Sequence, residues 1–268
     1  MILDTRQLFT TLLTKMQINT ICDVGSMNGA DSLNFRAAAP QASIYALEPN
    51  PHNLQLMNVD RELQENRIGI QPLAASNHDG VSDFFLVEAD YSQPNFRCGL
   101  SSLHRRWDPR YPSTSLVQVK TTRLDTFLAD KCRPKTRVAL WIDAEGMGYE
   151  VVEGATGIIE HVYLVHIEVE TTPCIGAEQK LYPEVKALLQ RLGLIELATD
   201  HDQAGEQFNA LFVRRDLPAG MSLALRSNLM RVRARSVLGA VARRLCPTCL
   251  RRYQSRRMSK DSGASRNS

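Results

Sequence analysis

Long hydrophobic runs are missing from this 268-residue sequence, and no apolar stretch approaches the roughly 18 residues that a membrane-spanning helix needs. The N-terminal segment MILDTRQLFTTLLTKMQ lacks the basic start and long apolar core of a signal peptide, and it is typical of a short amphipathic helix. Cysteine is scarce, and the six cysteines are mostly scattered singly, which favours a reducing compartment over a disulfide framework. The sequence therefore predicts a cytoplasmic protein.

The one close cysteine pair, Cys246 and Cys249, lacks the surroundings that would give it a function. A zinc site needs two further ligands at suitable spacing, and no second pair follows nearby. The pair also lies in an arginine-rich stretch, whereas a redox pair is expected at a helix start beside a sheet. We therefore assign no metal or redox site to it.

Acidic residues are almost missing from the C-terminal stretch. Residues 221–268 contain 12 Lys and Arg against the single acid Asp261, whereas residues 1–220 contain 20 Lys and Arg against 28 Asp and Glu, a net charge of −8. The breakers Leu-Pro-Ala-Gly at 217–220 separate the two parts. We therefore predict a domain over residues 1–216 and a basic tail over residues 217–268, partly helical and then disordered.

The tail has an apolar stripe at helical spacing, flanked by arginines. Steps of three and four residues join Met230, Ala234, Val237, Val241 and Leu245. Cationic residues beside a moderately apolar stripe are typical of a helix that lies on an anionic membrane surface. The sequence thus indicates peripheral contact with the inner membrane face. Two alternatives stay open: a helix docked on the acidic domain, or a disordered solubilising tail.

Strands and helices are expected to alternate through the first 216 residues. The expected strands are 18–24, 43–47, 68–75, 81–87, 115–122, 138–142, 162–169, 194–198 and 208–213, and the expected helices are 30–38, 51–64, 149–160 and 178–191. This alternation predicts an α/β fold with a mostly parallel sheet. The loop 199–207 is too short for a crossover helix, so the last strand is expected to be antiparallel.

The stretch ICDVGSMNGADS, residues 21–32, is typical of a ligand-binding turn after a first buried strand. Gly25 permits a sharp turn, Gly29 permits close approach, and free amides at the next helix start favour anionic groups. Glu48 ends the second strand, where an acid can accept hydrogen bonds from ribose hydroxyls. The alternative is that Asp23 is a helix cap or an ion-pair partner and Glu48 a solvated loop acid.

Two ligands fit an acid at the end of the second strand: a dinucleotide or S-adenosylmethionine. No glycine stands two residues after Gly25, so the G-x-G-x-x-G pattern of dinucleotide sites is missing. The expected antiparallel closing strand is also unlike a dinucleotide fold. Both observations favour S-adenosylmethionine.

Six segments resemble, in order, the FkbM-type S-adenosylmethionine-dependent methyltransferases over roughly residues 18–215: ICDVGSMNGADS, IYALEPNPHNLQLM, IQPLAASNHDG, GLSSL, TTRLDTF and LWIDAEGMGYEVVEGA. The resemblance implies a class I (Rossmann-like) methyltransferase fold and methyl transfer to a hydroxyl of a sugar or natural product. The expected cofactor-binding residues are Asp23, Gly25, Ser26, Asn28, Gly29, Glu48, Ala75 and Ser76. Members commonly have Asn at Met27 and Glu at Gly148, so one polar cofactor contact and one acid near the acceptor do not transfer.

Candidate bases cluster after the later strands. The expected catalytic residues are Asp143, Glu145, His166 and Glu168. His166, Glu168 and Glu170 alternate along one strand and so share a face, and a hydrogen-bond or ion-pair network would also explain them. Acids at two adjacent strand ends could hold a divalent metal, which the sequence does not favour.

The segment GLSSLHRRW, residues 99–107, is expected to lie over the pocket. His104 could belong to a lid, and Arg105, Arg106 and Trp107 could bind a charged or stacking sugar. A surface histidine and a plain basic loop are the alternatives. The segment therefore marks an acceptor side without identifying the acceptor.

The sequence favours an O-methyltransferase that acts on a glycan or glycan-like small molecule. A nucleic-acid methyltransferase is disfavoured, since residues 141–145 read Trp-Ile-Asp-Ala-Glu rather than the Pro-Pro-aromatic element of flipped-base chemistry, and the acidic domain would repel phosphates. A non-catalytic cofactor-binding or scaffold protein is the alternative that Met27 and Gly148 motivate.

Overall fold

The structure is a computed structural model that describes residues 4–87, 98–106, 113, 115–200, 206–217, 231–232 and 234. The elements described below belong to one compact unit, Ile2–Ser222. Trp107, the cysteine pair Cys246 and Cys249, and most of the predicted tail helix lie outside the described residues. Among the helices that the structure describes, none has both the length and the apolar character to cross a membrane.

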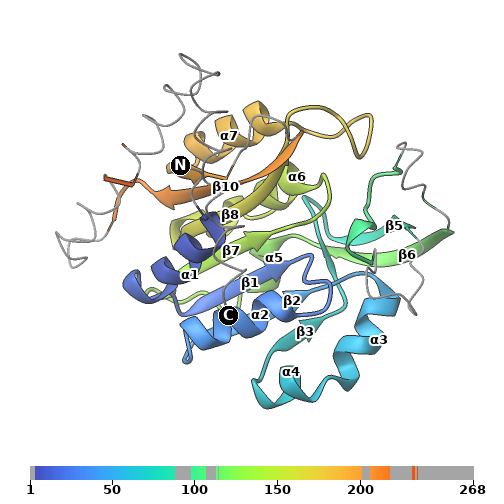
Figure 1. Ribbon diagram of the computed structural model, residues 1–268, viewed down its shortest axis with the longest axis horizontal. Helices are drawn as coiled ribbons and strands as arrows, with labels where there is room; N and C mark the ends of the chain where they lie inside the picture. The colour runs from blue at the N-terminus through green and yellow to red at the C-terminus, as the bar shows by residue number, and fades with distance from the viewer. Residues whose placement is uncertain are drawn as a thin grey trace, which may run out of the picture. The chain divides into compact units, whose positions relative to one another are not determined.

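The main sheet has seven strands in the order β3-β2-β1-β7-β8-β10-β9 (Figure 1). Their bounds are β1 Thr20–Val24, β2 Ser43–Leu47, β3 Gly69–Gln71, β7 Val138–Ile142, β8 Val162–Glu170, β9 Leu194–Thr199 and β10 Gln207–Arg214. β1 pairs in parallel with β2 and β7, and β10 pairs antiparallel with β8 and β9. The predicted class I methyltransferase fold and its antiparallel last strand are confirmed.

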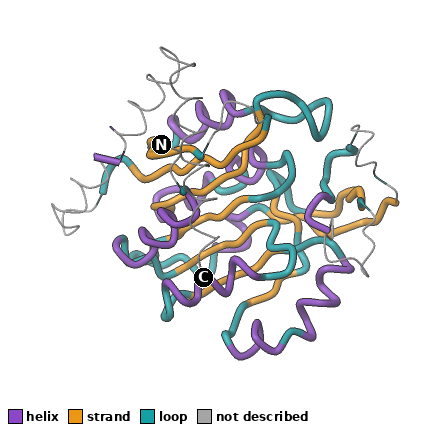
Figure 2. Tube along the Cα trace, viewed as in Figure 1, coloured by secondary structure: helices purple, strands orange, loops and turns teal. Residues whose placement is uncertain are grey.

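Helices cover both faces of this sheet (Figures 1 and 2). α1 Thr5–Lys15 packs on α2 Ala30–Ala38 and on β8, and Phe9 of α1 meets the ring of Trp141 at 5.2 Å. α6 Gly148–Glu153 and α7 Tyr182–Arg191 pack on each other and on β8, over a core that includes Leu140 and Val165. Because successive strand residues point to opposite faces, Trp141 and Leu140 place these two sets of helices on opposite sides.

The single helix expected over 51–64 is divided in two, α3 Pro51–Val59 and α4 Arg61–Glu65. Asp60 lies between them with extended backbone, and its carboxylate accepts hydrogen bonds from the backbone N–H groups of Glu62 and Leu63. An aspartate that caps a new helix competes with continuation of the old one. This local competition explains why the prediction of one helix was wrong.

The strand expected over 68–75 also divides, and its second half leaves the main sheet. β3 ends at Gln71, and β4 Ala74–Ala75 pairs in parallel with β6 Ser115–Thr122. β6 pairs antiparallel with β5 Gly80–Leu86, which completes a small sheet of order β4-β6-β5 beside the main one (Figure 1). Ala75 is thereby placed between the two sheets, next to the end of β2.

Two later helices are also shorter than expected. The stretch 149–160 forms α6 and then a 3-10 helix, Thr156–His161. A Cβ on Gly154, at the break, would lie 2.0 Å from the backbone oxygen of Ser76, so the chain turns where it touches the small sheet. The stretch 178–191 becomes helical only at Tyr182, and the short helix α5 Leu124–Leu128 was not predicted.

Candidate active site

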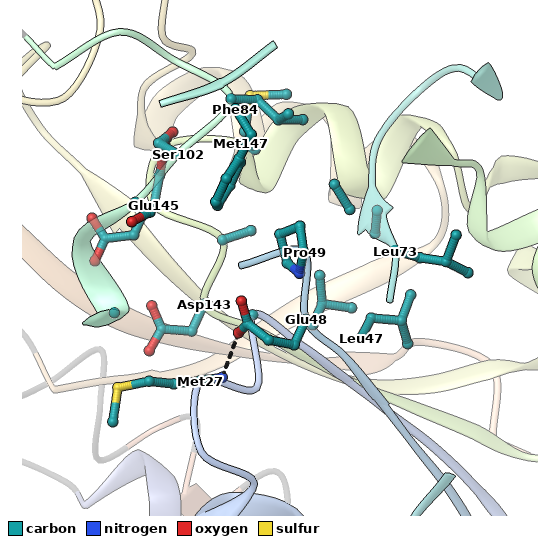
Figure 3. Close-up of a pocket in the computed structure, with 18 residues that line it drawn as sticks. Met27, Leu47, Glu48, Pro49, Leu73, Phe84, Ser102, Asp143, Glu145 and Met147 are labelled. Atoms are coloured by element: carbon teal, nitrogen blue, oxygen red, sulfur yellow. Dashed lines mark hydrogen bonds between the residues drawn. The ribbon is translucent and has the colours of Figure 1, made fainter. Parts of the chain in front are cut away.

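A pocket of about 500 Å³, part of it open to solvent, lies at the carboxyl ends of β1, β2 and β7 (Figure 3). The lining residues are Val24, Gly25, Met27, Leu47, Glu48, Pro49, Leu73, Ala74, Ala75, Phe84, Gly99, Ser101, Ser102, Leu103, Asp143, Ala144, Glu145 and Met147. This is the edge at which ligands bind in open α/β sheets. Of the twelve residues that the sequence predicted for the site, Gly25, Glu48, Ala75, Asp143 and Glu145 line the pocket.

Gly25 permits the close contact between the loops that follow β1 and β7. Its φ is +78°, and a Cβ there would stand 1.8 Å from the carbonyl oxygen of Asp143. Both the conformation and the space therefore exclude a side chain. This contact brings Asp143 to the pocket floor.

Asp23 supports the turn from beneath. Its buried carboxylate accepts hydrogen bonds from the hydroxyls of Ser26, at 2.9 Å, and Ser32, at 2.6 Å. Burial raises the pKa of Asp23 to about 6, against the lowering effect of the two serines. Asp23 and Ser26 are not among the pocket-lining residues, so their contacts fix the loop and the start of α2 rather than reaching into the pocket.

The backbone amides of the turn are largely used within the protein. Gly25 and Ser26 donate to the carbonyl of Leu47, Gly29 donates to Ser26, and the Ala30 amide donates to Asn28 Oδ1. Asn28 is exposed, and Gly29 packs on Leu63 of α4. The turn is thus a fixed support for the pocket, with fewer free amides than the sequence suggested.

Glu48 is held rigidly at the end of β2. Its Oε2 accepts the N–H of Met27 and its Oε1 accepts the N–H of Asn50, both at 2.7 Å. Only 4% of the residue is exposed, and burial raises the pKa of Glu48 to about 7. Each carboxylate oxygen accepts one backbone hydrogen bond, and the side chain of Asn53 adds another, so the carboxylate is fixed where it lines the pocket.

The pocket has an apolar end beside Glu48. Leu47, Leu73, Ala74 and Ala75 lie there, and Figure 3 shows Leu47 and Leu73 on the side away from Asp143 and Glu145. Ser76 is fully buried, and its hydroxyl contacts Asn77 and His78, so it does not line the pocket.

Three carboxylates gather at the other end. Ligand atoms of Asp143, Glu145 and Glu168 all lie within 4.8 Å of one another. Glu168 and Asp143 share a hydrogen bond, which requires that one of the two carboxyl groups carries a proton. Burial raises the pKa of Asp143 and Glu168, and it raises that of Glu145 to about 8. Acids this close cannot all ionise unless a positive group compensates them.

Arg106 supplies one positive group. Its guanidinium forms an ion pair with Glu145 and donates through Nε to the carbonyl of Leu100 at 2.6 Å, and its side chain is only 7% exposed. Ser102 Oγ donates to the carbonyl oxygen of Glu145 at 2.7 Å. Glu145 has a φ of +44°, which is unfavourable for an L-residue, so these two contacts hold it in place from both sides.

Residues 98–106, here called the roof segment, close the pocket opposite the sheet. Ser101 receives a hydrogen bond from the N–H of Val87 at 3.1 Å and lies 3.4 Å from the side-chain amide of Asn50. A bridge between Phe85 and Ser102 ties the segment to β5. These lining residues were not assigned as site residues from the sequence, although the GLSSL motif was the signal that could have found them.

His166 does not reach the pocket. It lies 2% exposed beneath α1, where its ring stacks on Trp141 with centroids 3.6 Å apart and its Nε2 meets Thr5 Oγ1 at 3.0 Å. Burial lowers the pKa of His166 to about 3, so the ring is neutral. Its catalytic role stays a prediction. The contacts that the structure shows are ring packing on Trp141 and a hydrogen bond with Thr5.

The two departures from the motif pattern have structural explanations. Met27, at φ +52°, lines the pocket, and its Sδ would lie 3.0 Å from a Cβ on Gly99 of the roof segment. Gly148 is buried, and a Cβ there would lie 2.9 Å from Ile167. His104 lies against Gly146 and Gly176 and is not among the pocket-lining residues.

Comparison with known protein families identifies one that matches this chain. A family model described as the methyltransferase FkbM domain matches residues 23–195. A search of curated proteins gives no significant match. The matched residues include every one that lines the pocket.

Solved structures give distant matches. The methyltransferase FkbM from Methylobacillus flagellatus KT is 14% identical, with 73% of this chain and 43% of that chain covered, at a TM-score of 0.45. The N-terminal domain of EvdMO1 with S-adenosylhomocysteine bound is 13% identical, with 79% of this chain and 81% of that chain covered, at a TM-score of 0.42. The bifunctional kinase-methyltransferase WbdD is 10% identical, with 79% and 38% covered, at 0.44. This chain thus spans less than half the length of the first and third of these structures.

Proposed function

Because the chain belongs to the FkbM methyltransferase family, we propose that it transfers a methyl group from S-adenosylmethionine to a hydroxyl of a glycan or glycan-like small molecule. One observation carries the proposal. The same pocket brings the buried acid Glu48, which ends β2, together with Asp143, whose carboxyl group is hydrogen-bonded to Glu168 behind the pocket wall. Glu48 suits binding of a ribose, and Asp143 suits proton removal from an acceptor hydroxyl.

The pocket residues fit the parts of S-adenosylmethionine. Glu48 would hold the ribose hydroxyls, since its two oxygens are already oriented by Met27 and Asn50. The apolar end at Leu73 and Ala75 would take the adenine, and the acidic end would face the methionine part. When bound, the cofactor supplies a methyl group on a positively charged sulfur.

Asp143 is the residue we assign to proton removal. Asp143 lines the pocket, whereas its hydrogen-bond partner Glu168 does not, so Asp143 is the member of the pair that can reach an acceptor hydroxyl. A base within hydrogen-bond reach contributes roughly 10²–10⁴-fold. Glu145, fixed by Arg106 and Ser102, would position the acceptor hydroxyl.

The roof segment supports a hydroxyl-rich acceptor. Ser101 and Ser102 line the pocket together with Glu145; serine hydroxyls can donate to or accept from sugar hydroxyls, and a carboxylate can accept from them. A divalent ion between Asp143, Glu145 and Glu168 is not needed for this proposal, because Arg106 and the shared proton already reduce their mutual repulsion.

We also propose that the basic tail, residues 217–268, brings the domain to an anionic membrane surface on its cytoplasmic side. The support is compositional: the tail carries 12 cationic residues and one acid from residue 221 onward. A lipid-linked glycan would be presented at such a surface.

Two measurements test the function. Calorimetry with S-adenosylmethionine measures cofactor binding, and a screen of sugars and glycans with a labelled methyl group measures transfer. Binding together with label in an O-methyl product is the expected result. Binding without transfer to any hydroxyl compound would favour a non-catalytic cofactor-binding protein, and absence of binding would refute the proposal.

A further inference from the structure

The ligand pocket is acidic, with no compensating cation on its wall. Glu48, Asp143 and Glu145 line it, and among the lining residues that the structure describes there is no Lys, Arg or His. The residues behind the wall add to this charge, because Glu168 lies beside Asp143, and Glu170 is buried near by. The pocket therefore favours positively charged ligands over neutral ones of the same shape.

The acids are not distributed evenly in the pocket. Both oxygens of Glu48 accept hydrogen bonds from backbone amides, those of Met27 and Asn50. Asp143 and Glu145 occupy the side opposite the apolar end in Figure 3, with Met27 below them. The excess negative charge is therefore concentrated at one end, where the methionine part of the cofactor would lie.

Arg106 limits this charge without cancelling it. It pairs with Glu145 and lowers the pKa of Glu145 and Glu170, while Arg6 acts on Asp143 only at a distance. Arg106 reaches Glu145 from the roof segment and does not line the pocket. Replacing Arg106 by a neutral residue therefore makes this end of the pocket more negative, and replacing Glu145 by a neutral residue makes it less negative.

Methyl transfer changes the charge of the donor at this end. The acceptor oxygen bonds to the methyl carbon, the carbon–sulfur bond breaks, and its electron pair stays on sulfur, while the hydroxyl proton passes to a base. The positively charged sulfur of S-adenosylmethionine thereby becomes the neutral sulfur of S-adenosylhomocysteine. Negatively charged groups near the sulfur attract the positively charged donor but give no such attraction to the neutral product.

We propose that Asp143 and Glu145 make the pocket select S-adenosylmethionine over S-adenosylhomocysteine by charge, so that the reaction itself weakens binding of the spent donor. The inference rests on the proposed function, since it assumes that this pocket holds the cofactor. It adds a specificity role to these two acids: they discriminate between substrate and product.

Calorimetry at pH 8 on the full chain tests this with three ligands. They are S-adenosylmethionine, S-adenosylhomocysteine and sinefungin, in which an amine-bearing carbon replaces the methylated sulfur. Both cationic ligands are expected to bind about tenfold or more tightly than S-adenosylhomocysteine. Sinefungin carries no transferable methyl group, so its behaviour reports charge alone.

Two variants move the ratio of the dissociation constants in opposite directions. Glu145→Gln should reduce the preference for the cationic ligands, and Arg106→Gln should increase it. Glu160→Gln, at an acid whose side chain is 77% exposed, is the matched control and should leave the ratio unchanged. Thermal unfolding checks that each variant is folded, and the wild-type ratio tests the inference even where a variant is not.

The outcomes separate the two proposals. Equal or tighter binding of S-adenosylhomocysteine to the wild-type chain overturns charge selection but leaves the cofactor assignment intact. If a folded Glu145→Gln variant keeps the wild-type ratio of dissociation constants, Glu145 has no part in charge selection. Failure of all three ligands to bind overturns the proposed function itself.

Discussion

Gly25 and Asp143 are in direct backbone contact: a Cβ on Gly25 would stand 1.8 Å from the carbonyl oxygen of Asp143. The contact joins the loops after β1 and β7, which are neighbours in the sheet. It fixes how far the catalytic candidate Asp143 lies from the turn that follows β1.

Gly25→Ala should therefore destabilise the protein strongly. The left-handed conformation alone costs an L-residue about 1–2 kcal/mol, and the overlap with Asp143 adds to it. Gly193→Ala is the matched control, because Gly193 also has a positive φ of +84° but open space around its Cβ position. Denaturant unfolding should show the larger loss for Gly25→Ala; equal losses would mean that the loops can separate without cost.

Glu48→Gln should weaken cofactor binding while the chain stays folded. Loss of hydrogen bonds from a charged group costs about 1.5–3 kcal/mol, which is roughly 10- to 150-fold in the dissociation constant. Glu62→Gln, at an exposed acid in α4, should bind normally. An unchanged dissociation constant in folded Glu48→Gln would remove Glu48 from the cofactor site.

Asp143→Asn should lower turnover at saturating cofactor by roughly 10²–10⁴-fold, because an amide cannot accept the hydroxyl proton. The measurement uses whichever acceptor the glycan screen identifies, with Asp130→Asn, at an exposed acid, as the control. Full turnover would exclude Asp143 as the base. We expect EDTA to have no effect; inhibition that a divalent ion reverses would instead assign a metal to the three acids.

The domain should lose stability as the pH rises from about 6.5 to about 8; below that range His166, whose folded pKa of about 3 lies under its ordinary value of 6.5, opposes the effect of the acids. The folded pKa of Glu145 is about 8 and that of Glu48 and of Glu170 about 7, against ordinary values near 4.5. Each group therefore binds its proton more tightly when folded, and its contribution is present at low pH and lost as the pH passes its folded pKa. For Glu145 the groups that face it are Asp143, Glu168, Glu170 and Arg106.

Melting temperatures measured across this range check the direction. Glu145→Gln should flatten the upper part of the curve, because the residue that titrates near pH 8 is gone. Added S-adenosylmethionine should raise the melting temperature more at pH 8 than at pH 6, since ionised acids favour the cation. A wild-type melting temperature that rises with pH would contradict the assignment.

The full chain should sediment with vesicles that contain anionic lipid at low salt, and a chain ending at Gly220 should not. Each arginine near such a surface contributes about 1 kcal/mol. Vesicles of neutral lipid are the control for non-specific adsorption. Equal behaviour of the two chains would leave the tail without a membrane role.

Regular elements were predictable where the sequence pattern and the burial agree. β1 and β7 are fully buried runs and β2 is buried at its end, each bounded by turn residues, so their positions could be predicted from the sequence. Asp60 was missed because its side chain caps a new helix, a local contact that apolar periodicity does not encode. The departure of β4 from the main sheet depends on its partner β6, some 40 residues later.

For the ionisable residues of the site, too, local position in the sequence was predictable and contacts made by the tertiary fold were not. Glu48 was placed correctly at the pocket because it directly ends a strand. Asp23 was predicted to bind the cofactor, yet Ser26 and Ser32 face its carboxylate inside the fold, and only the path of α2 decides this. His166 and Glu168 do share one face of β8, but α1 covers the first and leaves the second beside Asp143.

The roof segment is attached on both sides of the pocket, through Ser101 near Asn50 and through Ser102 and Arg106 on Glu145. One piece of chain therefore covers the places proposed for the donor and the acceptor. A displacement of this segment would therefore open both places at once. Where such opening limits the steady-state rate, acceptors of different intrinsic reactivity would turn over at similar speeds.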